Sequence, residues 1–134
     1  MGTIVVGYVP KAEGRAALHR AAEEARLRGS RLVVINSHRG GRDFDREDAL
    51  RSESELEEVR AELDEAGVEH EVRQLVRGLD PAEDLLGIAE EVKADLIVIG
   101  LRRRSPVGKL ILGSNAQRVL LDAACPVLAV KAGD

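Results

Sequence analysis

Aromatic side chains are almost absent from this sequence. Tyr8 and Phe44 are the aromatic residues, and they make up 1% of the 134 positions. Proteins that bind single-stranded nucleic acid stack bases on aromatic rings, so a platform of that kind is not expected here. The formal net charge is −4, so no overall positive field draws the chain toward DNA or an anionic membrane. We therefore expect neither nucleic acid nor a membrane as a partner.

Cysteine and long apolar runs are scarce as well. Cys125 is the one cysteine, so no disulfide can form within the chain, and a reducing compartment fits. Its position before Pro126, at the start of an apolar segment, favours a buried and unreactive thiol. No apolar run approaches the roughly 20 residues that cross a bilayer, and the opening residues MGTIVVG lack the features of a secretion signal. The expected location is the cytoplasm.

Patterns typical of metal sites and of catalysis are also missing. His19, His38 and His70 lie without the spacing of metal ligands, so we expect no metal site. The acidic run DFDRED could attract Mg²⁺, but its place in a polar, Gly-rich segment favours a solvated loop. No carboxylate or histidine is placed as a base beside the basic loop near the end of the chain, so we expect no catalytic residue and no enzyme.

The sequence does contain short apolar segments that predict strands. Most are apolar on both faces, which is typical of buried parallel strands. Glu69–Arg77 alternates between polar and apolar residues and is expected at an edge of the sheet. The predicted strands are Thr3–Tyr8, Arg31–Ser37, Glu69–Arg77, Asp95–Gly100 and Pro126–Lys131.

Helical spacing of apolar residues predicts four helices between these strands. Gly29 and Gly67 end the first two, Asp80 is the expected N-cap of the third, and Ser114 is expected to cap the fourth. The residues that mark the helices are Leu18, Ala21, Ala22 and Ala25; Leu56, Val59, Leu63 and Ala66; Ala82, Leu85, Leu86, Ala89 and Val92; and Ala116, Val119, Leu120 and Ala123.

Apolar strands that alternate with amphipathic helices indicate an α/β fold with an open parallel sheet and helices on both faces. The length fits one domain over residues 1–134. In such sheets a ligand binds beyond the carboxyl ends of the strands, at the point where the strand order reverses. The ends of the first and fourth strands are therefore the expected place for a site.

A basic, glycine-containing loop follows the fourth strand. It reads GLRRRSPVGKLILGSNAQ over residues 100–117. Glycines allow backbone N–H groups to approach an anion, a helix N-terminus at Gly113 and Ser114 favours negative charge, and Arg102, Arg103, Arg104 and Lys109 add cations. The alternative is a solvated surface turn that binds nothing. Neither a P-loop nor a G-x-G-x-x-G fingerprint is present.

The whole chain resembles the universal stress protein family, most specifically in this loop and the segment AQRVLLDAACPVLAVK behind it. The family pattern is Gly, two residues, Gly, nine residues, Gly, then Ser or Thr. Gly100 and Gly113-Ser114 match it, and Arg103 takes the place of the second glycine. The resemblance implies a Rossmann-like sheet of strand order 3-2-1-4-5 and a homodimer that pairs through the last strand, residues 126–131.

The resemblance also implies an adenine nucleotide as ligand, either ATP, AMP or cyclic AMP, with Mg²⁺ only if the nucleotide carries it. The adenine would lie between the ends of the first two strands and the phosphates in the loop after the fourth. The implied function is that of a stress-response sensor or regulator. The candidate ligand-binding residues are Gly7, Val9, Ser37, Gly100, Leu101, Arg102, Arg103, Arg104, Ser105, Gly108, Gly113, Ser114 and Asn115.

Two departures from the family pattern leave an alternative open. Val9 stands where the family commonly has an Asp that contacts the nucleoside, and loss of such a contact costs about 1–3 kcal/mol. Arg103 either blocks close approach of the backbone to phosphate or supplies the charge itself. The alternative is a nucleotide-free dimeric interaction module of the same family.

Overall fold

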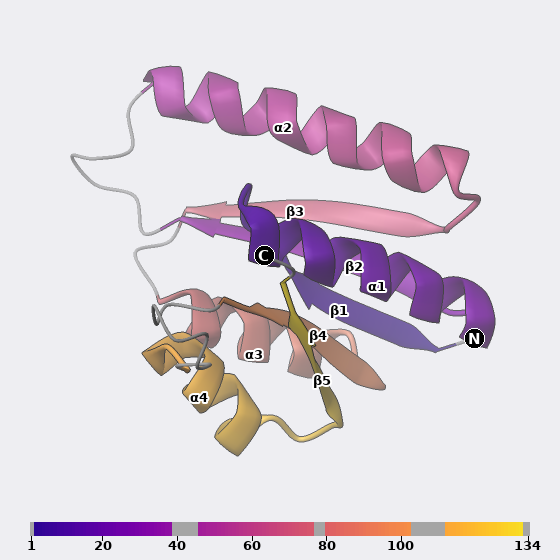
Figure 1. Ribbon diagram of the computed structural model, residues 1–134, viewed down its shortest axis with the longest axis vertical. Coiled ribbons are helices and arrows are strands. Elements are labelled where there is room, and N and C mark those ends of the chain that lie inside the picture. Colours follow the sequence, from indigo (N-terminus) through magenta and orange to yellow (C-terminus); the bar gives the residue numbers. More distant parts are fainter. Residues whose placement is uncertain (1, 39–45, 77–79, 103–111, 133–134) are drawn as a thin grey trace.

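A computed structural model of the chain shows five parallel strands between layers of helices (Figure 1). The structure describes residues 2–38, 46–76, 80–102 and 112–132. In chain order these contain β1 (Thr3–Gly7), α1 (Ala12–Arg28), β2 (Arg31–His38), α2 (Arg46–Glu65), β3 (His70–Val76), α3 (Pro81–Glu91), β4 (Leu96–Leu101), α4 (Ser114–Asp122) and β5 (Val127–Lys131).

The strand order is β3-β2-β1-β4-β5, as the resemblance to the family implies, and every neighbouring pair is parallel, as the sequence pattern predicts. The chain starts in the middle of the sheet, runs outward to β3 and then returns to β4 on the other side of β1. The order therefore reverses between β1 and β4, which is the Rossmann-like arrangement. A ligand site is expected at the carboxyl ends of these two strands.

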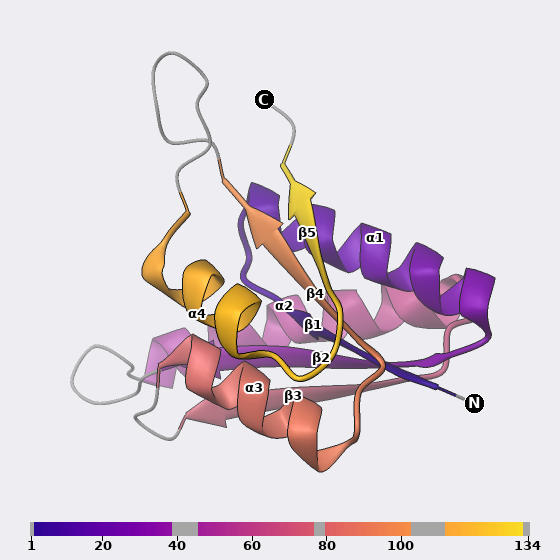
Figure 2. The ribbon, with the colours of Figure 1, turned by 90° about the horizontal axis from the view of Figure 1, so that it is seen from below.

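Alternate residues of the central strands build two separate cores. Ile4 and Val6 of β1 face α1 and α2, whereas Val5 faces α3 and α4, and all three are 0% exposed. The two helix pairs accordingly lie on opposite sides of the sheet (Figure 2). Burial on both faces explains why these strands are continuously apolar in sequence.

Two glycines allow the start of α1 to contact the strand ends directly. A Cβ atom on Gly14 of α1 would lie 1.8 Å from the carbonyl oxygen of Val9, and one on Gly100 of β4 would lie 2.0 Å from that of Glu13. Neither distance is possible for a real side chain. The backbone of α1 therefore approaches β1 and β4 at the point where the strand order reverses.

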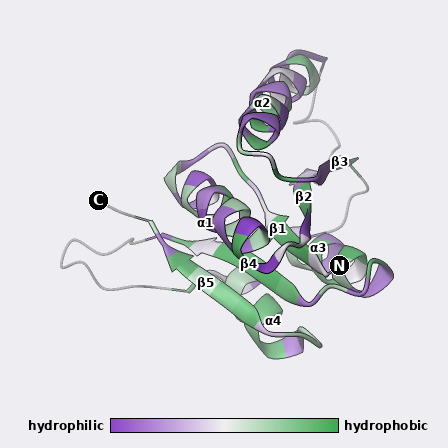
Figure 3. Ribbon diagram, turned by 90° about the vertical axis from the view of Figure 1, so that its right-hand side faces the viewer, coloured by the Kyte–Doolittle hydropathy of each residue, from purple (hydrophilic) through white to green (hydrophobic). Residues whose placement is uncertain are grey.

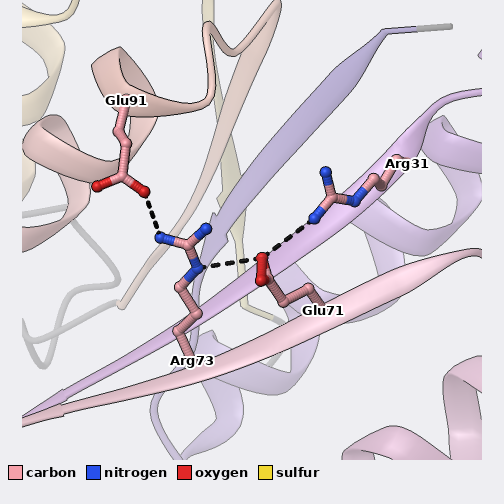
Figure 4. A network of polar contacts seen from close by, with 4 residues as sticks. All are labelled: Arg31, Glu71, Arg73 and Glu91. Atoms are coloured by element: carbon pink, nitrogen blue, oxygen red, sulfur yellow. Dashed lines mark hydrogen bonds and ion pairs between the residues drawn. The ribbon is translucent and has the colours of Figure 1, made fainter.

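The two edges of the sheet differ in polarity (Figure 3). On β3, Arg73 donates hydrogen bonds to Glu71 at 3.1 Å and to Glu91 of α3 at 2.7 Å, and Arg31 of β2 donates to Glu71 at 3.1 Å (Figure 4). On β5, Val127, Leu128, Ala129 and Val130 are half-buried and apolar. Charge on an edge strand disfavours pairing with another strand, so β5 is the more adhesive edge.

The structure corrects three sequence-based expectations. Ser114 is the first residue of α4 rather than its cap, because Gly113 occupies the N-cap position in an extended conformation. Residues 46–48, expected in a loop, form the first turn of α2. Cys125 is half-buried rather than fully buried, although burial still raises the pKa of its thiol.

Tyr8 packs in the core between α1 and α2 and is 6% exposed. Burial is the main cause that raises the pKa of Tyr8 above its ordinary value near 10, and Glu55, Glu62 and Glu58 add to the rise while Arg15 opposes it. The Tyr8 ring is therefore part of the hydrophobic core just after the end of β1.

Replacement of Gly14 should destabilise the fold through backbone overlap with Val9. We expect Gly14→Ala to lower the free energy of unfolding by about 1–3 kcal/mol, as for other overpacked sites. Gly87→Ala is the matched control, because Gly87 lies in α3 with open space around its Cα, and there the change should stabilise by about 0.5–1 kcal/mol. Urea unfolding measures the free energy of unfolding of both variants. Equal effects at Gly14 and Gly87 would contradict the close contact between Gly14 and the backbone of Val9.

Titration of the phenol checks the burial of Tyr8. Since the chain has one tyrosine and no tryptophan, tyrosinate absorbance reports this residue alone. The folded protein should ionise above pH 10 and the urea-unfolded chain near 10. Because the pKa of Tyr8 is higher in the folded protein than in the unfolded chain, the neutral phenol contributes to the stability of the fold. This contribution is fully present below the pKa of the unfolded chain and is lost as the pH rises through the pKa of the folded protein. Tyr8→Phe should remove the signal, and a folded midpoint at or below the unfolded one would disprove the assignment.

Candidate functional site

A pocket opens at the carboxyl end of the sheet, where the strand order reverses. The ends of β1, β2 and β4, the start of α1, and the first turns of α3 and α4 surround a cavity of about 150 Å³. Its lining residues are Gly7, Tyr8, Val9, Glu13, Gly14, Ile35, Ser37, Pro81, Ala82, Leu85, Ile99, Gly100, Asn115, Ala116 and Val119.

The inner surface of this pocket is apolar. Ile35, Leu85, Ile99 and Val119 are at most 7% exposed and belong to the core on the α3 and α4 side. Gly7 adds no side chain, and a Cβ there would lie 3.4 Å from the Cδ2 atom of Leu85. A surface of this kind accepts a flat, largely apolar group such as a nucleobase.

The pocket lining includes the hydroxyl of Ser37, whose proton takes part in a hydrogen bond within the protein. Ser37 Oγ donates a hydrogen bond to Oδ2 of Asp84, which is 0% exposed in α3. A hydroxyl has one proton and two acceptor lone pairs, so Ser37 offers acceptor capacity to the pocket. Sequence reasoning assigned Ser37 to the site but did not identify Asp84.

The pocket lining also includes an amide, Asn115, whose orientation is set by α3. Asn115 of α4 accepts a hydrogen bond at Oδ1 from the backbone N–H of Ala82, at 3.2 Å. Ala82 lies in the first turn of α3, where backbone N–H groups lack partners within the helix. Because Oδ1 is engaged in this way, the Nδ2 group of Asn115 is the donor that a ligand can meet.

A second contact joins α3 to α4 near the pocket. Arg118 donates from Nη1 to Oε1 of Glu83 at 3.0 Å. Both partners are partly exposed, so this ion pair contributes little stability by itself. Together with the bond from Ala82 to Asn115, it helps to hold α3 and α4 at a set separation.

A buried polar network lies behind β2 on the α1 and α2 side. Asn36 donates from Nδ2 to the carbonyl oxygen of Tyr8 at 3.2 Å and thereby ties β2 to the segment after β1. Its Oδ1 atom lies 2.5 Å from His38 Nε2 and accepts from Ser52 Oγ at 3.2 Å, and Gln74 Nε2 donates to Ser52 at 2.7 Å. This network positions the strand ends that form the pocket.

The structure brings five of the predicted site residues together at the pocket, namely Gly7, Val9, Ser37, Gly100 and Asn115. Arg102 is exposed after β4, and Gly113 and Ser114 are exposed at the start of α4 beside Asn115. The side chain of Leu101 is 7% exposed in the core, which leaves its backbone for any ligand contact. Arg103, Arg104, Ser105 and Gly108 lie outside the part of the chain that the structure describes.

Metal and membrane sites are not found among the described residues. Within residues 2–38, 46–76, 80–102 and 112–132, no three His, Cys, Asp or Glu side chains are grouped to hold a metal ion. His19 is exposed, and His70 Nδ1 lies 2.8 Å from the carbonyl oxygen of Val68. In the same ranges no helix has the length and apolar character that crossing a membrane requires.

Comparison with known proteins identifies the family. The sequence model described as universal stress protein family matches residues 1–131. A universal stress protein of Mycolicibacterium smegmatis is 48% identical over 128 residues, which covers 96% of each chain. A universal stress protein structure from Archaeoglobus fulgidus has a TM-score of 0.84 at 42% identity, covering 98% of this chain and 99% of that one. Another from Archaeoglobus fulgidus, in complex with dAMP, has a TM-score of 0.78 at 36% identity and covers 98% of both chains. The extent of these matches shows that this chain belongs to the universal stress protein family.

Proposed function

We propose that this protein binds an adenine nucleotide at the pocket between β1 and β4 and acts as a non-enzymatic regulator of a stress response in the cytoplasm. One observation carries the proposal: an apolar cavity at the strand-order reversal whose lining includes an acceptor at Ser37 and a donor at Asn115. A similar protein at 36% identity was solved with dAMP, which supports an adenine nucleotide as the class of ligand.

The base would occupy the apolar inner part of the pocket. A cavity of about 150 Å³ is smaller than the roughly 300 Å³ and more that drug-sized ligands fill, so it suits a base better than a whole nucleotide. Gly7 and Ile35 would face one side of the ring and Leu85 the other. The ribose and phosphates would then extend outward toward the start of α4.

The phosphates would lie at the N-terminus of α4 and in the loop before it. The first-turn N–H groups after Gly113 favour an anion, and Ser114 and Asn115 add polar donors. The resemblance to the family assigns Arg102, Arg103, Arg104, Ser105 and Gly108 to the same role. Bound in this way, ATP or AMP would bring Mg²⁺ only as its own counterion.

We infer a binding role rather than a catalytic one. The hydroxyl of Ser37 is hydrogen-bonded to Asp84, and the amide of Asn115 to Ala82, so both are held as positioning groups. Asn115 has no nucleophilic group, and we take the Ser37–Asp84 hydrogen bond as one that orients the hydroxyl for binding. Residues 1–134 would act as one domain whose surface around the pocket changes when nucleotide binds.

We further propose a homodimer that forms through residues 126–131. The carbonyl of Pro126 accepts from Ile97 N–H, and Ala132 N–H donates to Leu101, each at 3.0 Å. Backbone groups alternate in direction along a strand, so those of Val127, Ala129 and Lys131 point away from β4. An apolar strand with such groups at its edge favours pairing with a second copy.

The alternative is a nucleotide-free interaction module of the same family. Val9 supports it, because this residue is 38% exposed at the pocket and offers a ligand no hydrogen bond from its side chain. On this view the pocket stays filled with solvent and the surface around it serves a protein partner.

Isothermal titration with ATP, AMP and cyclic AMP at millimolar concentrations separates these two functions. We expect heat of binding with at least one of them and a rise in melting temperature with that ligand, about 2.7 kcal/mol of stabilisation at one hundred times Kd. Gly7→Val should fill the pocket and abolish both signals, and Gly87→Ala, which lies in open space on α3, should keep them. No heat with any of the three ligands would favour the nucleotide-free module.

The dimer is tested by a proline that removes one outward N–H group. Ala129→Pro deletes a donor at the free edge and leaves the hydrogen bonds to β4 in place, so it should turn the dimer into a monomer. Ala129→Val is the control, because it keeps the N–H group and the strand preference of the position. Light scattering should give twice the 14.5 kDa chain mass for the native protein and the valine variant. A native protein of single-chain mass would refute the dimer.

A further inference from the structure

We propose that the groove between α1 and α2 is a docking site for a basic amphipathic helix of a protein partner. The groove lies on the face of the sheet that these two helices cover side by side (Figure 1). It shares no lining residue with the pocket at the carboxyl end of the sheet. The proposal therefore adds a second surface to the protein and does not rest on nucleotide binding.

Two cavities that share Ala66 as a lining residue form the groove. Their volumes are about 320 and 410 Å³, and they are lined by residues from within 18–30 on the α1 side and 62–69 on the α2 side. Leu18 and Gly29 both line the groove, and the helical rise between them makes it about 17 Å long. A helix of about three turns has this length.

The floor of the groove is apolar. Leu18 and Leu63 are 3% and 1% exposed and belong to the hydrophobic core, against which Ala22 and Ala66 pack. The short side chains of these two alanines leave open the space that a longer side chain on either helix would fill. Partner helices dock in grooves of this kind by laying an apolar face on the floor.

The α2 rim of the groove carries a row of acidic side chains. Glu58, Glu62 and Glu65 recur at the spacing of one helix face, and Glu69 follows the end of α2. All four are exposed, and none forms an ion pair within the described part of the chain. On the opposite flank of α2, Glu53 forms an ion pair of 3.3 Å with a residue of the same helix. The acids along the groove are therefore available to a cationic partner.

This row of acids is unfavourable for the protein on its own. Like charges three or four residues apart on a helix repel each other. The sequence of α2 contains nine acidic and three basic residues, a net charge of −6, although the whole chain carries only −4. A partner with a row of lysines or arginines would relieve this repulsion, and complementary charge would also speed and orient its approach.

The α1 rim carries fewer charges, and they are of the opposite sign. Arg15, His19 and Arg26 are exposed at helical spacing, and none of them forms an ion pair with another described residue. The charges of the two rims therefore do not neutralise each other, and the excess of acid favours a partner whose flank toward α2 is basic. Because charges recur about once per turn on both rims, they match the side chains of a helix better than those of an extended strand, which alternate.

Binding of two synthetic peptides tests the proposal. Each has about 14 residues, near the length at which isolated helices form. Leucines lie along one face, and one flank carries lysines in the first peptide and glutamates in the second, with glutamine elsewhere. Their Kd values would be measured by fluorescence anisotropy on the native protein and on three variants, namely Glu62→Lys/Glu65→Lys at the groove, Glu53→Lys/Glu57→Lys on the opposite flank of α2, and Ala22→Gln on the floor. Thermal unfolding of each variant checks that it is folded.

The native protein should bind the lysine peptide about tenfold more tightly than the glutamate peptide. Glu62→Lys/Glu65→Lys should reverse this preference. Glu53→Lys/Glu57→Lys makes the same change in net charge but should keep the preference, because physiological salt largely screens charges on the far flank. Ala22→Gln should weaken binding of the lysine peptide about tenfold, since the longer side chain occupies the floor without changing the charge.

Three results would overturn the docking site. If the native protein binds neither peptide, or binds both equally, the groove does not select a basic helix. If the two double variants have equal effects, the attraction belongs to the acidic protein as a whole and not to the groove. If light scattering shows that Glu62→Lys/Glu65→Lys changes the mass of the native assembly, a second copy of the chain covers the groove instead. Should Ala22→Gln not fold, the comparison of the two double variants still decides the matter.

Discussion

The direct contact between the backbone of α1 and the ends of β1 and β4 is the constraint on which the site depends. Gly14 and Gly100 permit it, because any Cβ atom at either position would overlap a carbonyl oxygen. The helix thus starts at the reversal of strand order and forms one rim of the pocket. The remaining walls come from the end of β2 and from α3 and α4, and hydrogen bonds between these two helices hold their separation.

Most of the fold could be predicted from the sequence because its determinants are local. Continuous apolar strands, amphipathic helices and the glycines that end α1 and α2 are all visible in short segments, and the strand order followed from resemblance to the family. Ser114 was misplaced by one residue, because a serine before a helix is a common cap and the extended Gly113 leaves no sign of its role in sequence. The start of α2 at Arg46 was also missed, because the acidic, polar character of residues 43–48 favours a loop in sequence.

The site was less predictable because its determinants are pairwise and distant in sequence. Ser37 and Asp84 are 47 positions apart, and Ala82 and Asn115 are 33 apart. Asp84 has the character of a solvent-exposed helix residue, yet α3 buries it completely. Asn36 gave a weak signal as a polar residue in an apolar strand, but its partners Ser52 and Gln74 come from elements that only the folded chain brings near.

The unequal edges of the sheet also bear on the size of the proposed assembly. The ion pairs of Arg73 with Glu71 and Glu91 disfavour strand pairing at the β3 edge, so another strand would add more readily at β5. In the proposed dimer, two copies that meet through the same strand are related by a twofold axis, and each covers the apolar β5 edge of the other. A closed pair of this kind differs from an open fibre, in which every copy needs two complementary surfaces.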